Sequence, residues 1–561
     1  MQESFLFKDI MSRGEVIGQT KIALSFTPFD IIEQLKNPDT GELFLKFKFN
    51  GEERIFSAEE LASKKGVVML AKFGVITDET KAKHLCNYMT EVRALNNIPT
   101  SEIYTQMGWK SDGSFVLGER KFTLNGIVPC KFSIHGKEVQ AIKSLGDIEG
   151  WVTSVEGLLK HESQRFKIYN GVKATILYIL KDQNNIVNDS GGTSQGKTIT
   201  CMCATSMFGD PNGLMLAGGV TVVAAEQLAT QMCDLPIHID DIQKINKEDL
   251  DKIVYSIGNG IGKGRGAKDG GLQDTLRWRT VALFTGEDKI IKDDSFDGLD
   301  MRLLEVNGGL QKTDTQAIHD FKDGIKSHYG VFGPMLIEWL ISNKDEVLKM
   351  HKESIATVKA SIPGGDVMNQ NIIAVQDRLI GIFAPTLTAG KIFEMLYQTI
   401  GGTKKDPAII VTDAFKTALT DRAGESYTLR GARFILSWMA ANQSYFLSNG
   451  LREADSEGNS RQYRVLGNIK AAIYKDNKME KSGEYILIPS ELKKALNDKF
   501  SVERLMDDFK KQGLLIVGHG SKYTRSSRID GQSTKTYVLK REEFDLFAGV
   551  NMDEKNEDGK K

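Results

Sequence analysis

Residues 184–209 read NNIVNDSGGTSQGKTITCMCATSMFG, and this stretch decides the class of fold. The run NNIVND predicts a short buried strand, and ITCMCATSMFG predicts a helix. Between them, Gly191 to Thr198 fit the pattern GxxxxGK[ST] at every fixed position. Glycines let a backbone curl so that its amides face phosphate oxygens, and a helix N-terminus adds partial positive charge. The stretch therefore predicts a P-loop for a nucleotide.

The P-loop pattern assigns a role to each of its residues. Lys197 would reach the β- and γ-phosphates, and Thr198 would ligate magnesium, so ATP and Mg²⁺ are the predicted cofactors. The alternative is a glycine-rich turn with a chance lysine, which the flanking strand and helix disfavour. The residues expected to hold the phosphates are Gly191, Gly192, Thr193, Ser194, Gln195, Gly196, Lys197 and Thr198.

A second motif lies downstream, where LPIHIDD (235–241) joins an apolar strand to two acids. Asp240 is expected to hold magnesium directly or through water. Asp241 takes the position where many ATPases place a glutamate that polarises the attacking water, and aspartate there is a departure. The alternative is an acid pair that caps the next helix. The 43 positions from Lys197 to Asp240 leave room for a helix, a strand and a second helix. This spacing favours the magnesium-binding role over helix capping.

A glycine-rich, basic insert follows the helix expected at KEDLDKIVYSIG. Residues 258–271 read GNGIGKGRGAKDGG, and their two arms predict a β-hairpin with a basic tip. In a ring, Lys263, Arg265 and Lys268 would line a central pore and grip a phosphate backbone. Two alternatives stay open: a solvated basic loop, or Lys263 or Arg265 beside a neighbouring subunit's nucleotide.

Further candidates lie beyond the insert. The strand VALFTGE (281–287) ends in Thr285, which could sense the γ-phosphate or orient water, with Glu287 as a second candidate. Arg302 starts the next expected strand and suits an arginine finger inserted into a neighbouring site, against the alternative of a surface ion pair. Arg378, in a helical region, is either a nucleotide-sensing arginine of a lid or part of a helix salt bridge.

The C-terminal region predicts a winged helix. A strand leads into two helices joined by a short turn, and two more strands flank a basic loop. Residues 461–550 hold 18 Lys+Arg and 12 Asp+Glu, a net charge of +6, which favours DNA over an acidic peptide. A winged helix used for protein contacts is the alternative. The DNA-binding candidates are Lys510, Lys511, Lys522, Arg525, Arg528 and Lys535.

Composition bounds the rest of the chain. Its 561 residues exceed one ordinary core, and 40% hydrophobic with 26% charged residues indicate a globular protein. No uninterrupted apolar run reaches about 18 residues, which argues against a membrane span. The five cysteines form no CxxC pair, so reduced thiols and a cytoplasmic location are expected.

Before residue 183, FLKFKFN (44–50) and KFSIHG (131–136) predict strands, residues 77–96 predict a helix, residues 108–132 predict short strands broken by Gly and Asp turns, and Trp151 opens a long predicted helical stretch. From about residue 183, strands alternate with helices, so the fold class predicted is α/β with a parallel sheet. The predicted divisions are a mixed α+β domain with a possible DNA-binding or ring-collar role (1–148), the ATPase core (149–311), a helical lid or linker region (312–450) and the winged helix (463–548). Residues 451–462 are a plausible linker.

Together, GGTSQGKT, LPIHIDD, GNGIGKGRG, WRTVALFTGE and GLDMRLLEV resemble a P-loop helicase family of phages and mobile elements, long labelled a domain of unknown function. Within it, the chain is similar to the Rep/Cch-type, MCM-like self-loading replication initiator helicases of staphylococcal mobile islands. The resemblance covers residues from about 100 to 545. It implies an AAA+ core, a homo-hexameric ring, ATP with magnesium and a pre-sensor hairpin.

By motif match, the resemblance assigns Lys197 and Thr198 to Walker A, Asp240 and Asp241 to Walker B, Thr285 to sensor one and Arg302 to the finger. The chain departs from MCM proteins in having no Cys-rich zinc segment near its start. The first 100 residues are outside this analogy.

The leading hypothesis is an ATP-driven ring helicase that binds a replication origin through its winged helix, with single-stranded DNA in its pore. Two alternatives are a DNA-translocating or remodelling ATPase without unwinding, and a nucleotide-switched DNA-binding regulator. The basic hairpin discriminates, because a regulator needs no pore loop.

Overall fold

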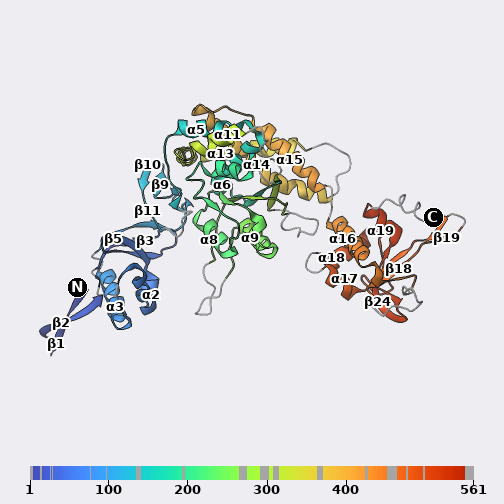
Figure 1. Ribbon diagram of the computed structural model, residues 1–561, viewed down its shortest axis with the longest axis horizontal. Helices are drawn as coiled ribbons and strands as arrows, with labels where there is room; N and C mark the ends of the chain where they lie inside the picture. Colours follow the sequence, from blue (N-terminus) through green and yellow to red (C-terminus); the bar gives the residue numbers. More distant parts are fainter. Residues whose placement is uncertain are drawn as a thin grey trace. The chain divides into compact units, whose positions relative to one another are not determined.

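The computed structural model divides into two compact units. Figure 1 shows its helices and strands. The first unit consists of Met1–Asp288, Val306–Thr357 and Phe383–Val411, and the second of Lys289–Glu305, Val358–Ile382 and Thr412–Lys561. The predicted boundaries at 148, 311 and 450 stay predictions. The structure describes residues 4–12, 15–25, 27, 29–75, 78–95, 98–133, 140–192, 196–264, 275–290, 302–306, 315–362, 370–423, 427–450, 464–475, 478–496 and 500–549.

The chain begins with a two-stranded ribbon and a five-stranded sheet of order β11-β6-β3-β4-β5. The strand expected at 44–50 is β4, and the helix expected near 77–96 is α3. Their apolar side chains, such as Phe47 and Leu85, are fully buried together. The elements are β1 (Ser4–Ser12), β2 (Glu15–Ser25), β3 (Phe29–Lys36), β4 (Leu43–Phe49), β5 (Glu52–Ser57), α1 (Ala58–Leu61), α2 (Lys64–Val68), α3 (Glu79–Leu95), β6 (Thr100–Tyr104) and β11 (Lys131–Phe132). The strand expected at 131–136 thus covers two described residues, and 134–139 lie outside the described residues.

A small antiparallel sheet of order β10-β9-β8-β7 links this region to the nucleotide-binding core. It confirms the short strands predicted between turns. Trp109 is buried, and its Nε1 donates to the carbonyl of Thr175 at 2.8 Å, while the Met107 amide donates to the carbonyl of Gln231 at 2.9 Å. The strands are β7 (Gly108–Trp109), β8 (Phe115–Leu117), β9 (Arg120–Thr123) and β10 (Gly126–Pro129).

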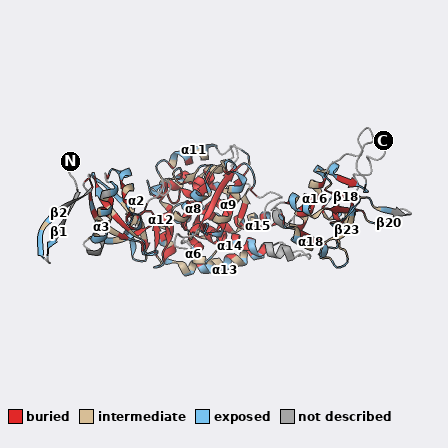
Figure 2. Ribbon diagram, turned by 90° about the horizontal axis from the view of Figure 1, so that it is seen from below, coloured by how far each residue is buried: buried red, intermediate tan, exposed pale blue. Residues whose placement is uncertain are grey.

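The core is a five-stranded sheet of order β13-β14-β15-β12-β16. β13, β14, β15 and β12 run parallel, and every residue of β12, β14 and β15 is buried, as expected for strands covered on both faces. These buried strands appear red in Figure 2. The predicted α/β core with a parallel sheet is thereby confirmed. The strands are β12 (Asn185–Ser190), β13 (Met215–Leu216), β14 (Ile237–Ile239), β15 (Val281–Gly286) and β16 (Leu303–Val306).

Two pairs of helices pack on the core strands. α6 (Glu162–Leu180) and α7 (Lys197–Thr205) pack on each other and against β15. α8 (Val222–Gln231) and α9 (Lys247–Asn259) pack on each other, with α9 against β12.

The long helical stretch expected from Trp151 onward is present, but it begins at Ile148 and is divided into two helices. α5 (Ile148–Glu156) ends before Gly157, and a 3-10 turn then leads to His161, whose extended backbone precedes the start of α6. Apolar residues continue through this break, so periodicity alone did not reveal it.

The predicted helical region is confirmed in the described residues. α14 contains a buried, apolar stretch, Gln376–Thr399, that is long enough to cross a membrane, but 83% of its window is buried within the fold, as in a core helix. The helices are α11 (Thr315–Gly324), α12 (Phe332–Ser342), α13 (Lys344–Ala360), α14 (Gln370–Thr399), α15 (Pro407–Ala423) and α16 (Tyr427–Ala441).

The C-terminal module has a mixed sheet of order β17-β18-β21-β24-β22, with β23 paired to β24. The loop predicted between the last two strands therefore contains a further strand, β23, which forms a hairpin with β24 around Asp530-Gly531. α16 and β17 contribute to the module's hydrophobic core. The elements are β17 (Phe446–Ser448), β18 (Gly467–Lys470), β19 (Ile473–Lys475), β20 (Lys478–Lys481), β21 (Glu484–Leu487), α17 (Pro489–Leu496), α18 (Val502–Lys511), β22 (Leu515–Ile516), β23 (Arg525–Ile529), β24 (Gln532–Lys540) and α19 (Arg541–Phe547).

Helix α6 carries a buried amine that should make stability depend on pH. Lys173 is 1% exposed, and burial lowers its pKa to about 7. An unfolded lysine has a pKa of about 10.4, so between these values the unfolded state binds one more proton. The free energy of unfolding should then rise with pH by about 1.4 kcal/mol per unit. Lys173→Met should stabilise the protein at pH 7, and this advantage should shrink toward pH 10.

Urea unfolding at pH 7, 8 and 9 measures this difference. Lys167→Met is the matched control on the same helix, because Lys167 forms an ion pair with the equally buried Asp189. Breaking that pair should destabilise the protein, by about 3–5 kcal/mol. A Lys173→Met advantage that is the same at every pH would contradict the assignment.

Candidate nucleotide-binding site

The backbone of the P-loop explains two of its glycines. Gly191 follows β12 with a φ of 152°, and Gly196 precedes α7 with a φ of 70° in the left-handed region. Side chains disfavour both conformations, which turn the loop back toward the helix N-terminus. Gly192 is exposed beside them, while Thr193, Ser194 and Gln195 lie outside the described residues.

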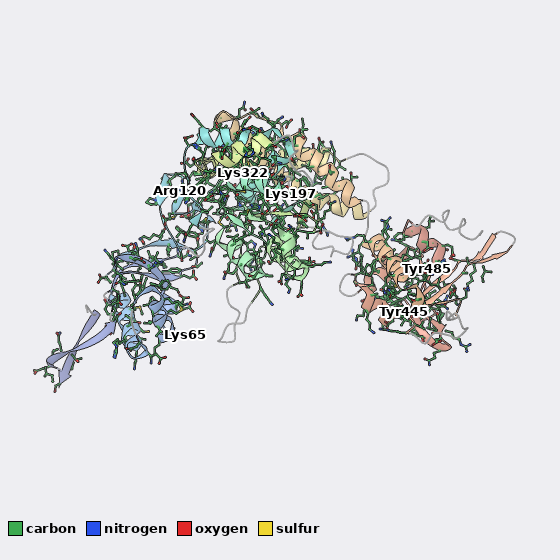
Figure 3. The ribbon with its side chains drawn as sticks, in the orientation of Figure 1. Lys65, Arg120, Lys197, Lys322, Tyr445 and Tyr485 are labelled. Atoms are coloured by element: carbon green, nitrogen blue, oxygen red, sulfur yellow. The ribbon has the colours of Figure 1, made fainter. Side chains whose placement is uncertain are left out.

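Lys197 lies at the first position of α7 (Figure 3). Its Nζ donates to the carbonyl oxygens of Gly191 at 2.9 Å and Gly192 at 2.7 Å. The ammonium group therefore lies over the loop whose backbone would surround the phosphates. This is the position expected for a lysine that neutralises phosphate charge.

The hydroxyl groups of Thr198 and Thr285, which come from different elements, meet at the Asp240 carboxylate. Thr198 Oγ1 donates to Asp240 Oδ1 at 2.9 Å, and Thr285 Oγ1 donates to the same oxygen. The sheet register explains this meeting: Ile239 pairs with Phe284, so the residues that follow on β14 and β15 lie side by side at the carboxyl edge. The structure thus brings together the predicted magnesium ligands and the predicted sensor residue.

The two acids proposed to activate water lie at the same edge. Asp241 directly follows Asp240, with a left-handed backbone, φ 55°, and its amide donates to Thr285 Oγ1 at 3.4 Å. Lys244 Nζ lies 2.7 Å from the Asp241 carboxylate and lowers its pKa. Glu287 is exposed directly after β15, and its carbonyl accepts from the Gly191 amide at 3.2 Å.

Two groups around the site, Lys244 and Lys167, were missed from the sequence. Lys244 was detectable, since it lies three residues after Asp241. Lys167, buried against Asp189 on the P-loop strand, was not, because 22 residues separate the pair. The apolar run around His238 predicts a packed core histidine, and the structure confirms it: the side chain is fully buried, and burial lowers its pKa to about 4, so the imidazole is neutral at ordinary pH.

These residues fit ATP with magnesium. The Thr198 hydroxyl and the Asp240 carboxylate are adjacent oxygen donors of the kind that Mg²⁺ takes, together with phosphate oxygens. Positive-φ glycines, a helix N-terminus and Lys197 supply the phosphate cradle. Elsewhere in the described ranges, no group of three or more His, Cys, Asp or Glu could hold a metal.

The described part of the basic insert is the base of a hairpin. Ile261 and Arg277 form an antiparallel bridge, and backbone bonds join Gly260 with Trp278 and Gly262 with Leu276. Lys263 is exposed just beyond this base. Arg265 and Lys268, at the predicted tip, lie outside the described residues.

The two candidate arginines belong to the other compact unit. Arg302 directly precedes β16, as the sequence predicted, and is partly buried. Arg378 is exposed on α14. Their roles at the nucleotide stay predictions.

The basic residues of the C-terminal module differ in their surroundings. Lys510 and Lys511 end α18, and Lys511 pairs with Asp507 at 2.7 Å. Lys522 pairs with Glu503 at 2.8 Å. Arg528 on β23 and Lys535 on β24 are exposed. Arg525 differs from these, because its guanidinium lies 2.7 Å from the buried Glu484 carboxylate.

Fold and site together define a P-loop α/β protein. Residues 9–277 match the family model described as "Domain of unknown function (DUF927)", the label of the family that the sequence resembles. The match begins nearer the N-terminus than the start at about residue 100 that the resemblance indicated. No curated protein matches the sequence. A solved structure titled "SCCmec type IV Cch - active helicase" has the same fold, with a TM-score of 0.64 over 94% of this chain and 96% of that one, at 20% identity.

The geometry yields a prediction about water activation. If Asp241 polarises the attacking water, Asp241→Asn should bind ATP normally and hydrolyse it roughly 10²–10⁴-fold more slowly, since a general base contributes that much. Glu287→Gln is the matched comparison, because both acids follow adjacent strands. Nucleotide binding and phosphate release measure the two steps. Normal hydrolysis by Asp241→Asn with a loss in Glu287→Gln would move the role to Glu287.

Proposed function

We propose that this protein is an ATP-dependent ring helicase that binds a replication origin and unwinds DNA for replication of a mobile genetic element. One observation carries the proposal: Lys197, Thr198, Asp240 and Thr285 converge at one edge of the sheet. The fold supports it, since it matches a structure titled as an active helicase along nearly its whole length.

An AAA+ core is the finer assignment. It is supported by the position of β15, which carries Thr285 and separates the P-loop strand from the strand that ends at Asp240. The insert before β15, whose base is paired, supports a pre-sensor hairpin. A homo-hexameric ring follows from the same assignment, with Arg302 of one subunit reaching the nucleotide of the next and Arg378 acting from the helical lid.

Each residue at the nucleotide has a separate proposed role in ATP hydrolysis. Lys197 would neutralise charge on the β- and γ-phosphates, and Thr285 would hold Asp240 in place. Asp241 or Glu287 would take a proton from the attacking water. Magnesium, held by Thr198 and Asp240, would supply charge stabilisation on the transferred phosphoryl group.

Two separate DNA contacts are part of the proposal. In the pore, Lys263, Arg265 and Lys268 would hold the backbone of a single strand. The C-terminal module would act as a winged helix on the origin duplex, with α18 in the major groove. Lys510, Lys511, Lys522 and Arg528 would contact phosphates, while the Glu484 ion pair leaves Arg525 a weaker candidate.

The test is ATP-dependent displacement of a labelled strand, alongside particle sizing with nucleotide. Arg265→Ala with Lys268→Ala should lose unwinding and keep binding to the origin duplex. Removing the C-terminal module should do the reverse: origin preference falls and ATPase persists. The deletion should begin at about residue 424, because α16 and β17 contribute to that module's core.

Fluorescence anisotropy with origin and scrambled duplexes measures the preference. If DNA stimulates hydrolysis without strand displacement, the protein is a translocating or remodelling ATPase. If the truncated protein still prefers the origin, recognition belongs to the first 100 residues.

A further inference from the structure

A pocket of about 480 Å³ lies in the first compact unit, where the end of α6 meets the start of α13 and the residues before β15. Its lining includes the apolar Leu177 and Leu348, the ring of Tyr178 and three cations, Lys181, Arg279 and Lys344. None of its lining residues is acidic. Such a lining suits an anion that also carries an apolar or aromatic part.

The aromatic part of the pocket is a stack of the Trp109 ring, the Tyr178 ring and the Arg279 guanidinium, which is called the plate below. Tyr178 is 36% exposed and stacks on the buried Trp109, with ring centroids 5.7 Å apart and planes 14° apart. The Arg279 guanidinium lies 4.8 Å from the Tyr178 ring centre, and Lys344 Nζ lies 4.5 Å from that of Trp109. Nucleic-acid bases stack on aromatic rings and on guanidinium planes.

This plate is held in place before any ligand binds. Arg279 makes two hydrogen bonds to the fully buried Asp234, Nε to Oδ1 at 2.7 Å and Nη2 to Oδ2 at 2.9 Å. The Trp109 amide donates to the same carboxylate at 2.9 Å. Asp234 thereby fixes Arg279, which lines the pocket, and Trp109, on which Tyr178 stacks, and this lowers the ordering cost of binding.

The backbone conformation of Lys181 is a second observation that points to a ligand site at this pocket. It ends α6 in the left-handed region, φ 54°, where glycine is the favoured residue. A lysine at this position costs stability, and strained residues gather at functional sites. Its side chain is exposed at the pocket, and it forms no ion pair within the described ranges.

We propose that this pocket binds one nucleotide of single-stranded DNA, with the base on the Tyr178–Arg279 plate and the phosphate against Lys181 and Lys344. Arg279 directly follows Trp278, which pairs with Gly260 at the base of the hairpin. This inference rests on the proposed function in taking DNA as the ligand.

The test is fluorescence anisotropy of the full chain with labelled oligothymidine, with an abasic strand of equal length and with a duplex, over a salt series. Lys181→Gly should keep or raise the melting temperature, because glycine relaxes the left-handed turn, and yet weaken binding and lower the salt slope by about 0.7. Tyr178→Ala should bind oligothymidine about tenfold more weakly and the abasic strand nearly as well as the unmodified protein. Lys349→Ala, an equal change of charge on exposed α13 surface, should change binding little.

Two outcomes would overturn the inference. In the first, Lys181→Gly and Tyr178→Ala bind oligothymidine as tightly as the unmodified protein does. In the second, both variants lose affinity for duplex and for single-stranded DNA equally. Strand displacement by the unmodified protein separates this inference from the proposed function. Displacement with unaffected binding by both variants rejects the pocket alone. Lost binding without any displacement supports the pocket and rejects the helicase.

Discussion

Lys197→Ala is expected to lower ATP hydrolysis by about 10³-fold, toward background, since a preorganised charge at the phosphates contributes that much to the transition state. The fold should be unaffected. The Lys197 ammonium contacts only loop carbonyls of Gly191 and Gly192 among the described residues, and it supports no part of the core.

Phosphate release at saturating ATP measures the loss of hydrolysis, and a thermal melt measures whether the fold is unaffected. Lys322→Ala is the control, because Lys322 is an exposed lysine at the end of α11 (Figure 3). Hydrolysis at the unmodified rate in Lys197→Ala would remove the P-loop from the mechanism. A lowered melting temperature would instead mean that Lys197 stabilises the fold.

The site could be predicted where its chemistry is local in sequence. The P-loop is eight consecutive residues, and Asp240 and Thr285 each end a buried apolar run. Parallel strands place such ends at one edge, so the meeting of Thr198, Asp240 and Thr285 follows from reading three short segments. The sheet order was not predictable in this way, because no local pattern states which strand lies beside β12.

The interactions that the sequence did not reveal join distant segments. Asp234 and Arg279 are 45 residues apart, and neither lies in a motif. The pocket at Tyr178 combines the end of α6, the start of α13 and the segment before β15. Arg525 shows the opposite failure: counting charge made it a DNA-binding candidate, whereas its guanidinium is bound to a buried carboxylate. Composition counts cations without their partners.

Arg302→Ala should lower ATP hydrolysis about 10³-fold or more, because arginine fingers contribute 10³–10⁵ to phosphoryl transfer. ATP binding should be retained, since a finger acts on charge that develops in the transition state. The sequence motif and the position directly before β16 motivate this role. The loss alone does not separate a finger in the neighbouring subunit from one in the same chain.

Mixing the Arg302→Ala and Lys197→Ala variants distinguishes a finger in the neighbouring subunit from one in the same chain. In a ring with sites between subunits, an Arg302→Ala subunit supplies an intact Lys197, and a Lys197→Ala neighbour supplies an intact Arg302. Random mixing at equal amounts gives this pairing at about a quarter of the interfaces. ATPase should therefore return in mixed rings, whose formation is followed by co-purification through a tag on one variant. Mixed rings that form and stay inactive would mean that Arg302 acts within its own chain or supports its structure, because a finger shared between subunits must complement.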